Sequence, residues 1–363
     1  MTNYLLAGGG TAGHVNPLLA LADAIMQQPG SHQVWALGTE EGIEDRLVPQ
    51  RGYRLLTIER LPFPRRIGKA AFRFPGKYAR AVRLTETYLR EHDIDVVVGF
   101  GGYASAPAYS AARKLGIPVV VHEANALPGL ANRLAANWAA AVGVAFANTK
   151  LKNATFVGMP LRAEVAALAG KRNRADQVAA RAHFGLDETA TTLLVTGGSL
   201  GAARLNETIE ASRSLLAAAG ISVLHIVGDR SKLEPEHLAD FSRLKYCDRM
   251  DLAITAADFA VARAGAATVS EFAAVGLPAV YVPYPVGNGE QRFNVQDLVA
   301  AGGGMLCLDA QFTPQFVADQ LIPAISNTRA RTQMAEAAKQ HGVADGATRL
   351  LKLVNGVLPQ QLS

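Results

Sequence analysis

A short apolar segment that leads into a glycine-rich turn and then into a helix occurs twice along this chain. Near the start, residues 4–7 (YLLA) meet the turn GGGTAGH at residues 8–14, and a helix is predicted from about Pro17 to Gln27. Near the middle, residues 193–196 (LLVT) meet GGSLG at residues 197–201, and a helix follows to about Leu216. Such turns bring backbone N–H groups and a helix N-terminus close to an anionic ligand. Each turn could also serve packing alone, so neither defines a site by itself.

The rest of the chain alternates in the same way between short apolar segments and helical ones. This alternation is typical of α/β proteins with doubly wound parallel sheets. Gly158 and Pro160 interrupt it, and 363 residues suffice for about two domains, so we predict a domain boundary near residue 160. The further strands are expected at residues 34–38, 54–58, 96–99, 119–122 and 142–144 in the first half, and at 222–227, 259–262, 279–282 and 305–308 in the second.

Composition narrows the classes of protein to which the chain can belong. With 49% hydrophobic and 18% charged residues, it has the balance of a globular protein rather than that of a disordered chain. Its two cysteines, Cys247 and Cys307, are too few and too far apart for a disulfide framework or a zinc site, which favours a reducing cytosol. No apolar stretch reaches the roughly 18 residues of a membrane span, and the start lacks the pattern of a signal peptide. We therefore expect a protein that does not span a membrane.

Two common nucleotide-binding signatures do not fit the glycine-rich turns. A dinucleotide-binding fingerprint needs an acidic residue at the end of the second strand. Here that strand is expected to end at Thr39, Glu40 already lies in the loop, and the sequence has no Gly-Lys-Ser/Thr of a P-loop. A third turn, GFGGYASAP at residues 99–107, adds another backbone cradle. Three such turns suggest two phosphorylated ligands, one on each domain.

Five segments, in their order and spacing, resemble those of a known family. They are GGGTAGHVNP (8–17), GGYASAP (101–107), HEAN (122–125), GGSLGA (197–202) and RAGAATVSE (263–271). Together they resemble the MurG family, the UDP-N-acetylglucosamine:N-acetylmuramyl-(pentapeptide) pyrophosphoryl-undecaprenol N-acetylglucosaminyltransferases of bacterial cell-wall synthesis. The resemblance extends from residue 8 to about residue 294. The sequence departs from the family's pattern at Met159, Ala106 and Glu290.

The resemblance implies a GT-B fold, in which two Rossmann-like, doubly wound parallel-sheet domains face a cleft. The first domain, which would bind the acceptor and the membrane, is expected to comprise residues 1–160 and a returning C-terminal helix at about 343–358. The second, at 161–342, would bind UDP-N-acetylglucosamine. The implied chemistry is an inverting transfer without metal or cofactor. The 4-hydroxyl of the muramyl sugar of lipid I, the undecaprenyl-diphosphate-linked MurNAc-pentapeptide, attacks the anomeric carbon of the donor, which gives β-1,4-linked lipid II and releases UDP.

Residue roles follow from matching positions to the motifs of the family. His14 is the expected catalytic base, because imidazole has a suitable pKa for taking the proton of the acceptor; its alternative role is a hydrogen bond to the diphosphate or the backbone. Glu271 is expected to accept hydrogen bonds from the ribose hydroxyls, and the start of its helix would face the diphosphate. On the acceptor side, His122 could instead be a structural histidine. The expected contacts to UDP-N-acetylglucosamine are Thr11, Ala12, Gly13, Asn125, Arg162, Gly198, Ser199, Cys247, Ala266, Ala267, Thr268, Glu271 and Gln291, and those on the acceptor side are Gly10, Tyr103, Ser105 and His122.

The positive charge of the chain is concentrated in its first half. Residues 1–150 contain 16 Lys and Arg against 11 Asp and Glu, a balance of +5, whereas the remaining residues are balanced at 20 against 20. Residues 60–83 hold eight of the cations without an acid, interleaved with aromatic and aliphatic residues. Because the implied acceptor is a polyprenyl lipid, this run is expected to contact an anionic membrane surface. The expected membrane-contact residues are Phe63, Arg65, Arg66, Ile67, Lys69, Phe72, Arg73, Phe74 and Lys77.

Several alternatives stay open at the level of sequence. The basic run could be a solvated loop, whereas nucleic-acid binding is disfavoured because no stacking aromatics on a known binding fold are recognisable. Another GT-B protein, such as a natural-product glycosyltransferase or a UDP-sugar epimerase, would share the architecture. A non-catalytic, membrane-bound scaffold that kept the nucleotide site is the alternative outside enzymes. The expected location is the cytoplasmic face of the cell membrane as a peripheral protein, with other cell-wall and division proteins as further partners.

Overall fold

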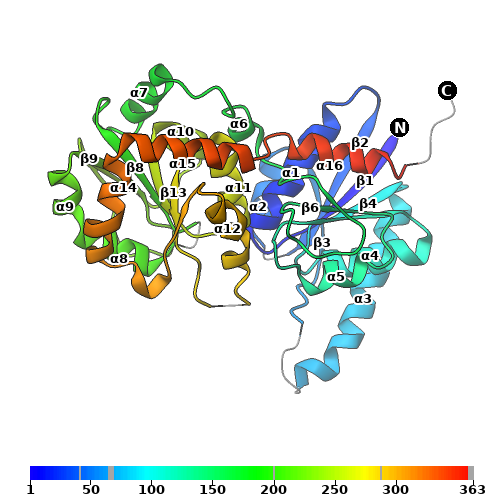
Figure 1. The fold of residues 1–363 in the computed structure, drawn as a ribbon. Helices are drawn as coiled ribbons and strands as arrows, with labels where there is room; N and C mark the ends of the chain where they lie inside the picture. The colour runs from blue at the N-terminus through cyan, green and yellow to red at the C-terminus, as the bar shows by residue number, and fades with distance from the viewer. Residues whose placement is uncertain (41, 64–68, 199–200, 287, 359–363) are drawn as a thin grey trace. The chain divides into compact units, whose positions relative to one another are not determined.

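The chain folds into two compact units. The computed structural model describes residues 1–363 apart from 41, 64–68, 199–200, 287 and 359–363 (Figure 1). Unit 1 consists of Met1–Arg162 together with the chain from Asp345 onward, and unit 2 consists of Ala163–Ala344. The chain therefore leaves unit 1 after Arg162, where the sequence places the boundary after residue 160, and returns after Ala344, where the sequence places it after residue 342.

Unit 1 is built on a sheet of seven parallel strands in the order β3-β2-β1-β4-β5-β6-β7. Its strands are β1 (Thr2–Ala7), β2 (His32–Thr39), β3 (Arg54–Ile58), β4 (Val96–Gly99), β5 (Val119–Glu123), β6 (Ala141–Val144) and β7 (Ala154–Phe156). Its helices are α1 (Ala12–Met26), α2 (Glu44–Gln50), α3 (Lys69–Glu91), α4 (Ser105–Leu115), α5 (Leu130–Ala135) and α16 (Gly346–Asn355). The expected α/β class and doubly wound parallel sheet are confirmed for this unit.

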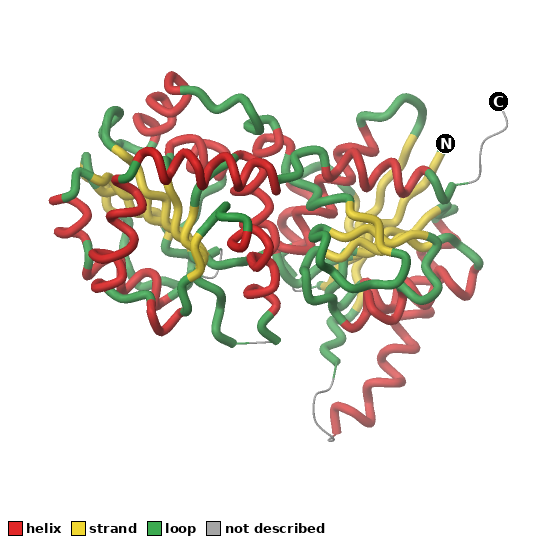
Figure 2. The backbone as a smooth tube through the Cα atoms, viewed as in Figure 1, coloured by secondary structure: helices red, strands yellow, loops and turns green. Residues whose placement is uncertain are grey.

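Both faces of the unit 1 sheet are covered by helices, which explains its nearly continuous apolar strands. Successive side chains of a strand point to opposite faces, so Tyr4 and Leu6 join one apolar core while Leu5 and Ala7 join the other. Residues of α3, α4 and α5 fill the core that contains Leu5, and residues of α1, α2 and α16 fill the opposite one. Figure 2 shows helices on both sides of the strands. The carboxyl ends of the strands are thereby left to the loops, which include the first and third glycine-rich turns.

The C-terminal helix α16 belongs to unit 1, as the family resemblance implies. Leu350, Leu351 and Val354 are buried in the same core as α1. A Cβ on Gly346 would lie 2.2 Å from the carbonyl oxygen of Met159, so the start of α16 packs directly on the end of the first crossing segment. Since only a glycine permits this approach, the two segments of chain that connect the units meet at one place in unit 1.

Unit 2 contains a second seven-stranded sheet, in the order β10-β11-β9-β8-β12-β13-β14, in which only β10 and β11 pair antiparallel. Its strands are β8 (Thr191–Thr196), β9 (Ile221–Ile226), β10 (Glu236–Leu238), β11 (Phe241–Leu244), β12 (Phe259–Ala262), β13 (Ala279–Tyr281) and β14 (Met305–Leu306). Its helices are α6 (Ala163–Ala166), α7 (Arg174–His183), α8 (Ala203–Ala211), α9 (Arg213–Ala218), α10 (Met250–Ala256), α11 (Ala266–Val275), α12 (Glu290–Ala300), the short turns η1 (Asp309–Gln311) and η2 (Val317–Leu321), α13 (Pro314–Phe316), α14 (Ile322–Ser326) and α15 (Thr328–His341).

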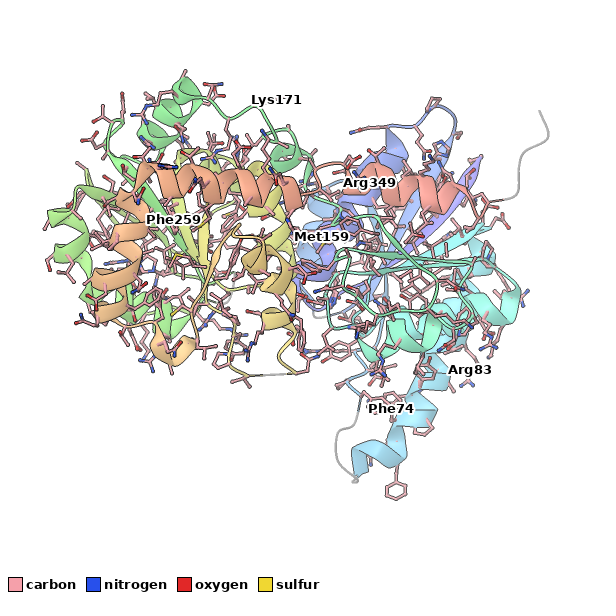
Figure 3. All side chains as sticks on the ribbon, in the orientation of Figure 1. Phe74, Arg83, Met159, Lys171, Phe259 and Arg349 are labelled. Atoms are coloured by element: carbon pink, nitrogen blue, oxygen red, sulfur yellow. The ribbon has the colours of Figure 1, made fainter. Side chains whose placement is uncertain are left out.

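The structure has three strands that the sequence does not predict, and two helices where the sequence predicts one. The sequence pattern does not predict the strands β7, β10 and β11. Of these, β7 is exposed throughout, and β11 carries Arg243 in a buried position. The Arg243 guanidinium donates to both carboxylate oxygens of Glu210, at 3.0 and 2.6 Å, which permits a charged residue inside the sheet. The single helix predicted after the second glycine-rich turn is two helices, α8 and α9, joined at Ser212. Phe259 in β12 belongs to the buried hydrophobic core of this unit (Figure 3).

Candidate active-site residues of the two units

His14 lies in the first turn of α1 rather than in the loop before it. The sequence-based start of this helix at Pro17 is wrong: α1 begins at Ala12, after Thr11, and Pro17 lies within it. The error arises because proline commonly opens helices, whereas here it occupies a later position of the helix. Thr11 has extended backbone angles and an exposed side chain, while Ala12 and Gly13 are half-buried. The imidazole is therefore fixed to a helix that the core of unit 1 holds in place.

The hydrogen bonds of His14 define which ring nitrogen is available for chemistry. Its Nδ1 lies 3.1 Å from the carbonyl oxygen of Gly9, with the Thr11 hydroxyl at 3.2 Å. Because a carbonyl oxygen only accepts, Nδ1 carries the proton and Nε2 keeps its lone pair. A Cβ on Gly101 would lie 3.3 Å from Nε2, so a glycine at this position leaves room beside the free nitrogen. The ring is thus held in the tautomer that a general base requires.

Burial and nearby acids act on the pKa of His14 in opposite directions. Burial is the larger influence and lowers the pKa of His14 from its ordinary value of 6.5, because the charged ring loses solvation. The negative charge of Glu123, the Gly9 carbonyl and the charge of Glu44 raise the pKa in turn. A neutral imidazole at neutral pH is the form that can accept a proton.

The end of β5 holds a buried carboxylate close to the first turn of α1. Glu123 accepts hydrogen bonds from the N–H groups of Asn125 at 2.8 Å and Gly129 at 3.0 Å, and from the Asn132 side-chain amide at 2.9 Å. The Asn132 amide oxygen accepts from the hydroxyl of Tyr109 at 2.8 Å. These bonds fix the loop that carries Asn125, one of the expected donor contacts. Sequence reasoning did not find Asn132 or Tyr109, because neither stands within a motif.

Ser105 is buried, and its hydroxyl fastens the third glycine-rich turn, at residues 99–107, to β1. Its Oγ accepts from the Gly101 N–H at 3.0 Å and lies 2.9 Å from the Ala7 carbonyl oxygen. A Cβ on Gly102 would lie 2.4 Å from the Gly9 carbonyl oxygen, so the first and third glycine-rich turns approach each other closely. Ser105 therefore has a structural role in these turns, and its expected acceptor contact stays a prediction.

Tyr103 and Gly10 lie next to each other at the edge of these turns. The nearest atoms to a Cβ on Gly10 would be those of the Tyr103 ring, at 3.8 Å, and the Arg60 guanidinium lies 5.1 Å from the centre of the same ring. The Gly10 N–H, however, donates to the carboxylate of Glu44 at 2.9 Å. This amide is therefore bonded to a buried carboxylate in the structure, and the acceptor contact of Gly10 stays a prediction.

His122 is buried at the end of β5, which favours the structural alternative over direct ligand contact. Its Nε2 donates to the Gly158 carbonyl oxygen at 3.2 Å, and no described group forms a hydrogen bond with its Nδ1. The Phe100 ring lies 5.6 Å away, centre to centre. Burial lowers the pKa of His122 to about 4, because the apolar surroundings disfavour the charged ring.

The depressed pKa of His122 predicts a loss of stability in acid. Between pH 6.5 and about 4 the unfolded chain binds a proton at this residue that the folded chain does not, so stability falls as pH falls through that window. A pKa shift of this size corresponds to roughly 3 kcal/mol in the free energy of unfolding. His122→Gln keeps a donor for Gly158 and should reduce the difference in urea midpoint between pH 7 and pH 4.5.

His32→Gln is a matched control for this measurement, because that ring is only half-buried in the same unit. An unchanged pH difference in His122→Gln would show that His122 does not control acid stability.

In unit 2, the first turn of α11 has the features of an anion-binding helix start. Gly265 precedes the helix in an extended conformation, and no side chain caps the helix there. Ala266 is buried, while Ala267 and Thr268 are half-buried. The first N–H groups of a helix have no partner within it, so those of this turn can serve an anion. Glu271 follows one turn later on the same face as Thr268 and is buried.

The remaining expected donor contacts lie at the start of α12, in loops of unit 2 and at Arg162 of unit 1. Gln291, in the first turn of α12, is half-buried and accepts from the Tyr284 N–H at 2.9 Å. Cys247 is buried, and Gly198 is exposed with a positive φ of 83°. Ser199 lies outside the described residues. Arg162, the last residue before unit 2, is half-buried.

The expected membrane-contact residues of unit 1 divide into exposed and packed ones. Phe63 and Phe72 are 62% and 82% exposed, and Arg73 is exposed. Phe74 instead stacks on Tyr78 at 5.8 Å between ring centres and packs against the core. Arg65, Arg66 and Ile67, as well as the side chain of Lys69, lie outside the described residues.

Phe74 and Lys77 are half-buried and each has a partner within unit 1, and their membrane contact stays a prediction. Lys77 forms an ion pair with Glu59, an acid that stands just before the basic run. Figure 1 shows the first turns of α3 projecting beyond the sheet of unit 1, and Figure 3 places Phe74 and Arg83 on that helix. No helix within the described ranges combines the length and the apolar character needed to cross a bilayer.

Comparison with known proteins identifies relatives over the whole chain. The N-terminal domain of glycosyltransferase family 28 matches residues 4–144, and its C-terminal domain matches residues 192–350. A UDP-N-acetylglucosamine--N-acetylmuramyl-(pentapeptide) pyrophosphoryl-undecaprenol N-acetylglucosamine transferase of Leifsonia xyli is 57% identical, over 98% of each chain. The crystal structure of Acinetobacter baumannii MurG is 30% identical, with a TM-score of 0.76, and covers 98% of this chain and 100% of its own. The glycosyltransferase of kitacinnamycin, 16% identical with a TM-score of 0.72 over 99% of each chain, shares the fold alone.

Proposed function

Because the chain belongs to the MurG family within glycosyltransferase family 28, we propose that unit 1 binds the lipid acceptor and unit 2 binds the sugar nucleotide. The reaction transfers N-acetylglucosamine from UDP-N-acetylglucosamine to the 4-hydroxyl of the muramyl sugar in undecaprenyl-diphosphate-linked MurNAc-pentapeptide, the lipid I to lipid II step of peptidoglycan synthesis. The identity of 57% over nearly the full chain is the observation that carries this function.

The start of α11 supports the assignment of the nucleotide to unit 2. Its uncapped N–H groups, at Ala266 and the two residues that follow, are suited to the diphosphate, whose negative charge grows as UDP leaves. Glu271 provides the carboxylate that would accept from the two ribose hydroxyls. The proposed contacts to the rest of the donor are Gly198, Cys247 and Gln291. Arg162 is the proposed partner of the donor's phosphates.

His14 is the proposed base of the transfer. The 4-hydroxyl oxygen of the acceptor forms a bond to the anomeric carbon of N-acetylglucosamine, while the bond from that carbon to the phosphate oxygen breaks and its electrons leave with UDP. The hydroxyl proton moves to Nε2, the nitrogen that the Gly9 contact leaves unprotonated. A single displacement of this kind inverts the anomeric configuration. Tyr103 is a proposed contact on the acceptor side, and Asn125 is a proposed contact to the donor.

A transfer assay with labelled UDP-N-acetylglucosamine and lipid I tests the function. Label should appear in the lipid product in equal amount to the UDP released. An acceptor whose muramyl 4-hydroxyl is replaced by hydrogen should give no labelled lipid, because the attacking oxygen is absent. Release of UDP without labelled lipid, or an epimerised free sugar, would contradict the proposal and favour the epimerase alternative.

The exposed side chains around the start of α3 form the proposed membrane contact. Phe63 and Phe72 expose large apolar surfaces, and Arg73 adds a charge that attracts anionic lipid. A lipid-linked acceptor requires such a contact, and we place the working protein at the cytoplasmic face of the membrane as a peripheral protein. Attachment through a few side chains is reversible.

Liposome sedimentation tests this contact. Phe72→Ser should weaken binding to vesicles with anionic lipid by about tenfold, because an inserted phenylalanine contributes roughly 1.5–3 kcal/mol when fully buried. Phe156→Ser, which changes an exposed phenylalanine of β7 in the same unit, should bind as the unmodified protein does. Equal weakening by both substitutions would place the contact elsewhere.

A further inference from the structure

Glu44 is a carboxylate enclosed by glycines at the ends of β1 and β2. It lies in the first turn of α2 and is 1% exposed. A Cβ on Gly9, Gly38 or Gly42 would lie 2.2, 2.5 or 2.1 Å from an atom of its side chain, so the three glycines leave the space that the Glu44 side chain occupies. Burying a carboxylate is costly unless its oxygens are hydrogen-bonded. A carboxylate buried to this degree therefore needs hydrogen-bond donors close to both oxygens.

Each oxygen of Glu44 is occupied by a donor. Oε1 accepts from the N–H and the hydroxyl of Thr39, both at 2.9 Å, and Oε2 accepts from the N–H of Gly10 at 2.9 Å. The carboxylate therefore joins the end of β2 to the first glycine-rich turn. Charge-assisted bonds of this kind are shorter and stronger than neutral ones.

The peptide group between Gly9 and Gly10 connects this carboxylate to His14. Its N–H donates to Glu44, and its carbonyl oxygen accepts from His14 Nδ1 at 3.1 Å. In a trans peptide the N–H and the C=O point in opposite directions, so one planar unit carries both bonds. Hydrogen bonds in such a chain polarise one another, and the negative carboxylate makes the carbonyl oxygen a stronger acceptor.

We propose that Glu44 is a positioning residue for the reaction, which acts through the Gly9–Gly10 peptide to hold His14 in its Nδ1–H tautomer with Nε2 free. This inference rests on the proposed role of His14 as the base. It corresponds to the carboxylate that orients a catalytic histidine in hydrolases, with a peptide group inserted between the two side chains. Glu44 does not touch substrate in this arrangement.

The charge of Glu44 also supports the basicity of His14. Burial lowers the pKa of His14, and the charges of Glu123 and Glu44 oppose this change. His122, at the end of β5, is the further titratable group whose charge interacts with that of His14, and Tyr103 with the overlying Arg60 lies beside Gly10 of the same turn. Removal of the Glu44 charge should lower the pKa of His14 further and make it a weaker base.

Two substitutions with opposite expected effects test the proposal. In Glu44→Gln, turnover should fall by about tenfold, and the acidic limb of its pH profile should move to lower pH by about 0.5 unit, because the base is less readily protonated. Thr39→Val removes one donor from the carboxylate and keeps its charge. The bond to Gly10 should then strengthen, and the limb should move to higher pH.

Asp45→Asn is the matched control, since Asp45 is exposed and stands next to Glu44 in the same helical turn. It should leave both turnover and the pH profile unchanged. A carboxylate that serves only as a structural brace would lower turnover in both test variants without moving the acidic limb in either direction, and that result would overturn the proposal.

An NMR measurement separates this inference from the role of His14 as the base. With ¹⁵N-labelled histidine, the full-length protein should show His14 protonated at Nδ1, and Glu44→Gln should shift this resonance. If Glu44→Gln does not fold, a shift of the same resonance in Thr39→Val tests the positioning role instead. An unmoved resonance in the test variants contradicts the positioning role. Normal turnover of a His14 variant would contradict only the assignment of the base.

Discussion

Replacing His14 by alanine should lower turnover by roughly 10²–10⁴-fold, the usual contribution of a positioned general base. The effect is expected because Nε2 is the only ring nitrogen that the Gly9 contact leaves able to accept a proton. Binding of UDP should persist, since the proposed nucleotide contacts of largest effect lie in unit 2. The acidic limb of turnover in the unmodified protein should lie below pH 6.5, because burial lowers the pKa of His14 and the neutral ring is the active form.

Turnover should be measured at saturating concentrations of both substrates, and UDP binding by calorimetry. His32→Ala, in unit 1 and half-buried, is the matched control and should retain full turnover. Near-normal turnover of His14→Ala would mean that water or another group takes the proton of the acceptor hydroxyl. His14 would then serve as a hydrogen-bond donor to the ligand.

Replacing Glu271 by glutamine should weaken UDP binding by about 10- to 100-fold. A carboxylate that accepts from both ribose hydroxyls makes two charge-assisted bonds, each worth roughly 1.5–3 kcal/mol, and an amide keeps part of one of them. Its burial makes the loss larger, because solvent does not replace the missing partner. Turnover at saturating donor should change much less than the affinity does.

The specific readout for Glu271 is the preference for UDP over 2′-deoxy-UDP. The unmodified protein should bind UDP more tightly, and Glu271→Gln should lose most of that preference. Glu336→Gln, an exposed acid on α15 in the same unit, is the matched control. If Glu271→Gln kept the full preference, the ribose would be recognised by another residue.

The two sheets and the family could be predicted from sequence because their signals are local. Apolar strands that run into glycine-rich turns specify parallel α/β units, and the five motifs lie in those turns. The exceptions have physical reasons. Strand β11 has a buried arginine, which an apolar pattern does not include and which Glu210 neutralises from α8. Pro17 indicated a helix start, although the backbone turns into α1 already at Ala12.

The direction in which a motif side chain points could not be predicted. Ser105 and His122 stand in the right motifs, but both side chains are buried and bonded to the backbone of unit 1. Glu44 shows the reverse case. The acid that the sequence pattern brings near the second strand is Glu40, in the loop after it, whereas the carboxylate that contacts the first glycine-rich turn is Glu44 of the following helix. A contact of this kind depends on loop geometry, which spacing does not encode.

The most direct test of the whole account is the linkage in the product. The enzyme should be incubated with UDP-N-acetylglucosamine and lipid I, and the released disaccharide examined by NMR. A single displacement with a base that activates the acceptor hydroxyl predicts N-acetylglucosamine joined to the 4-oxygen of the muramyl sugar in the β configuration. An α linkage, attachment at another hydroxyl, or absence of a disaccharide would contradict the account.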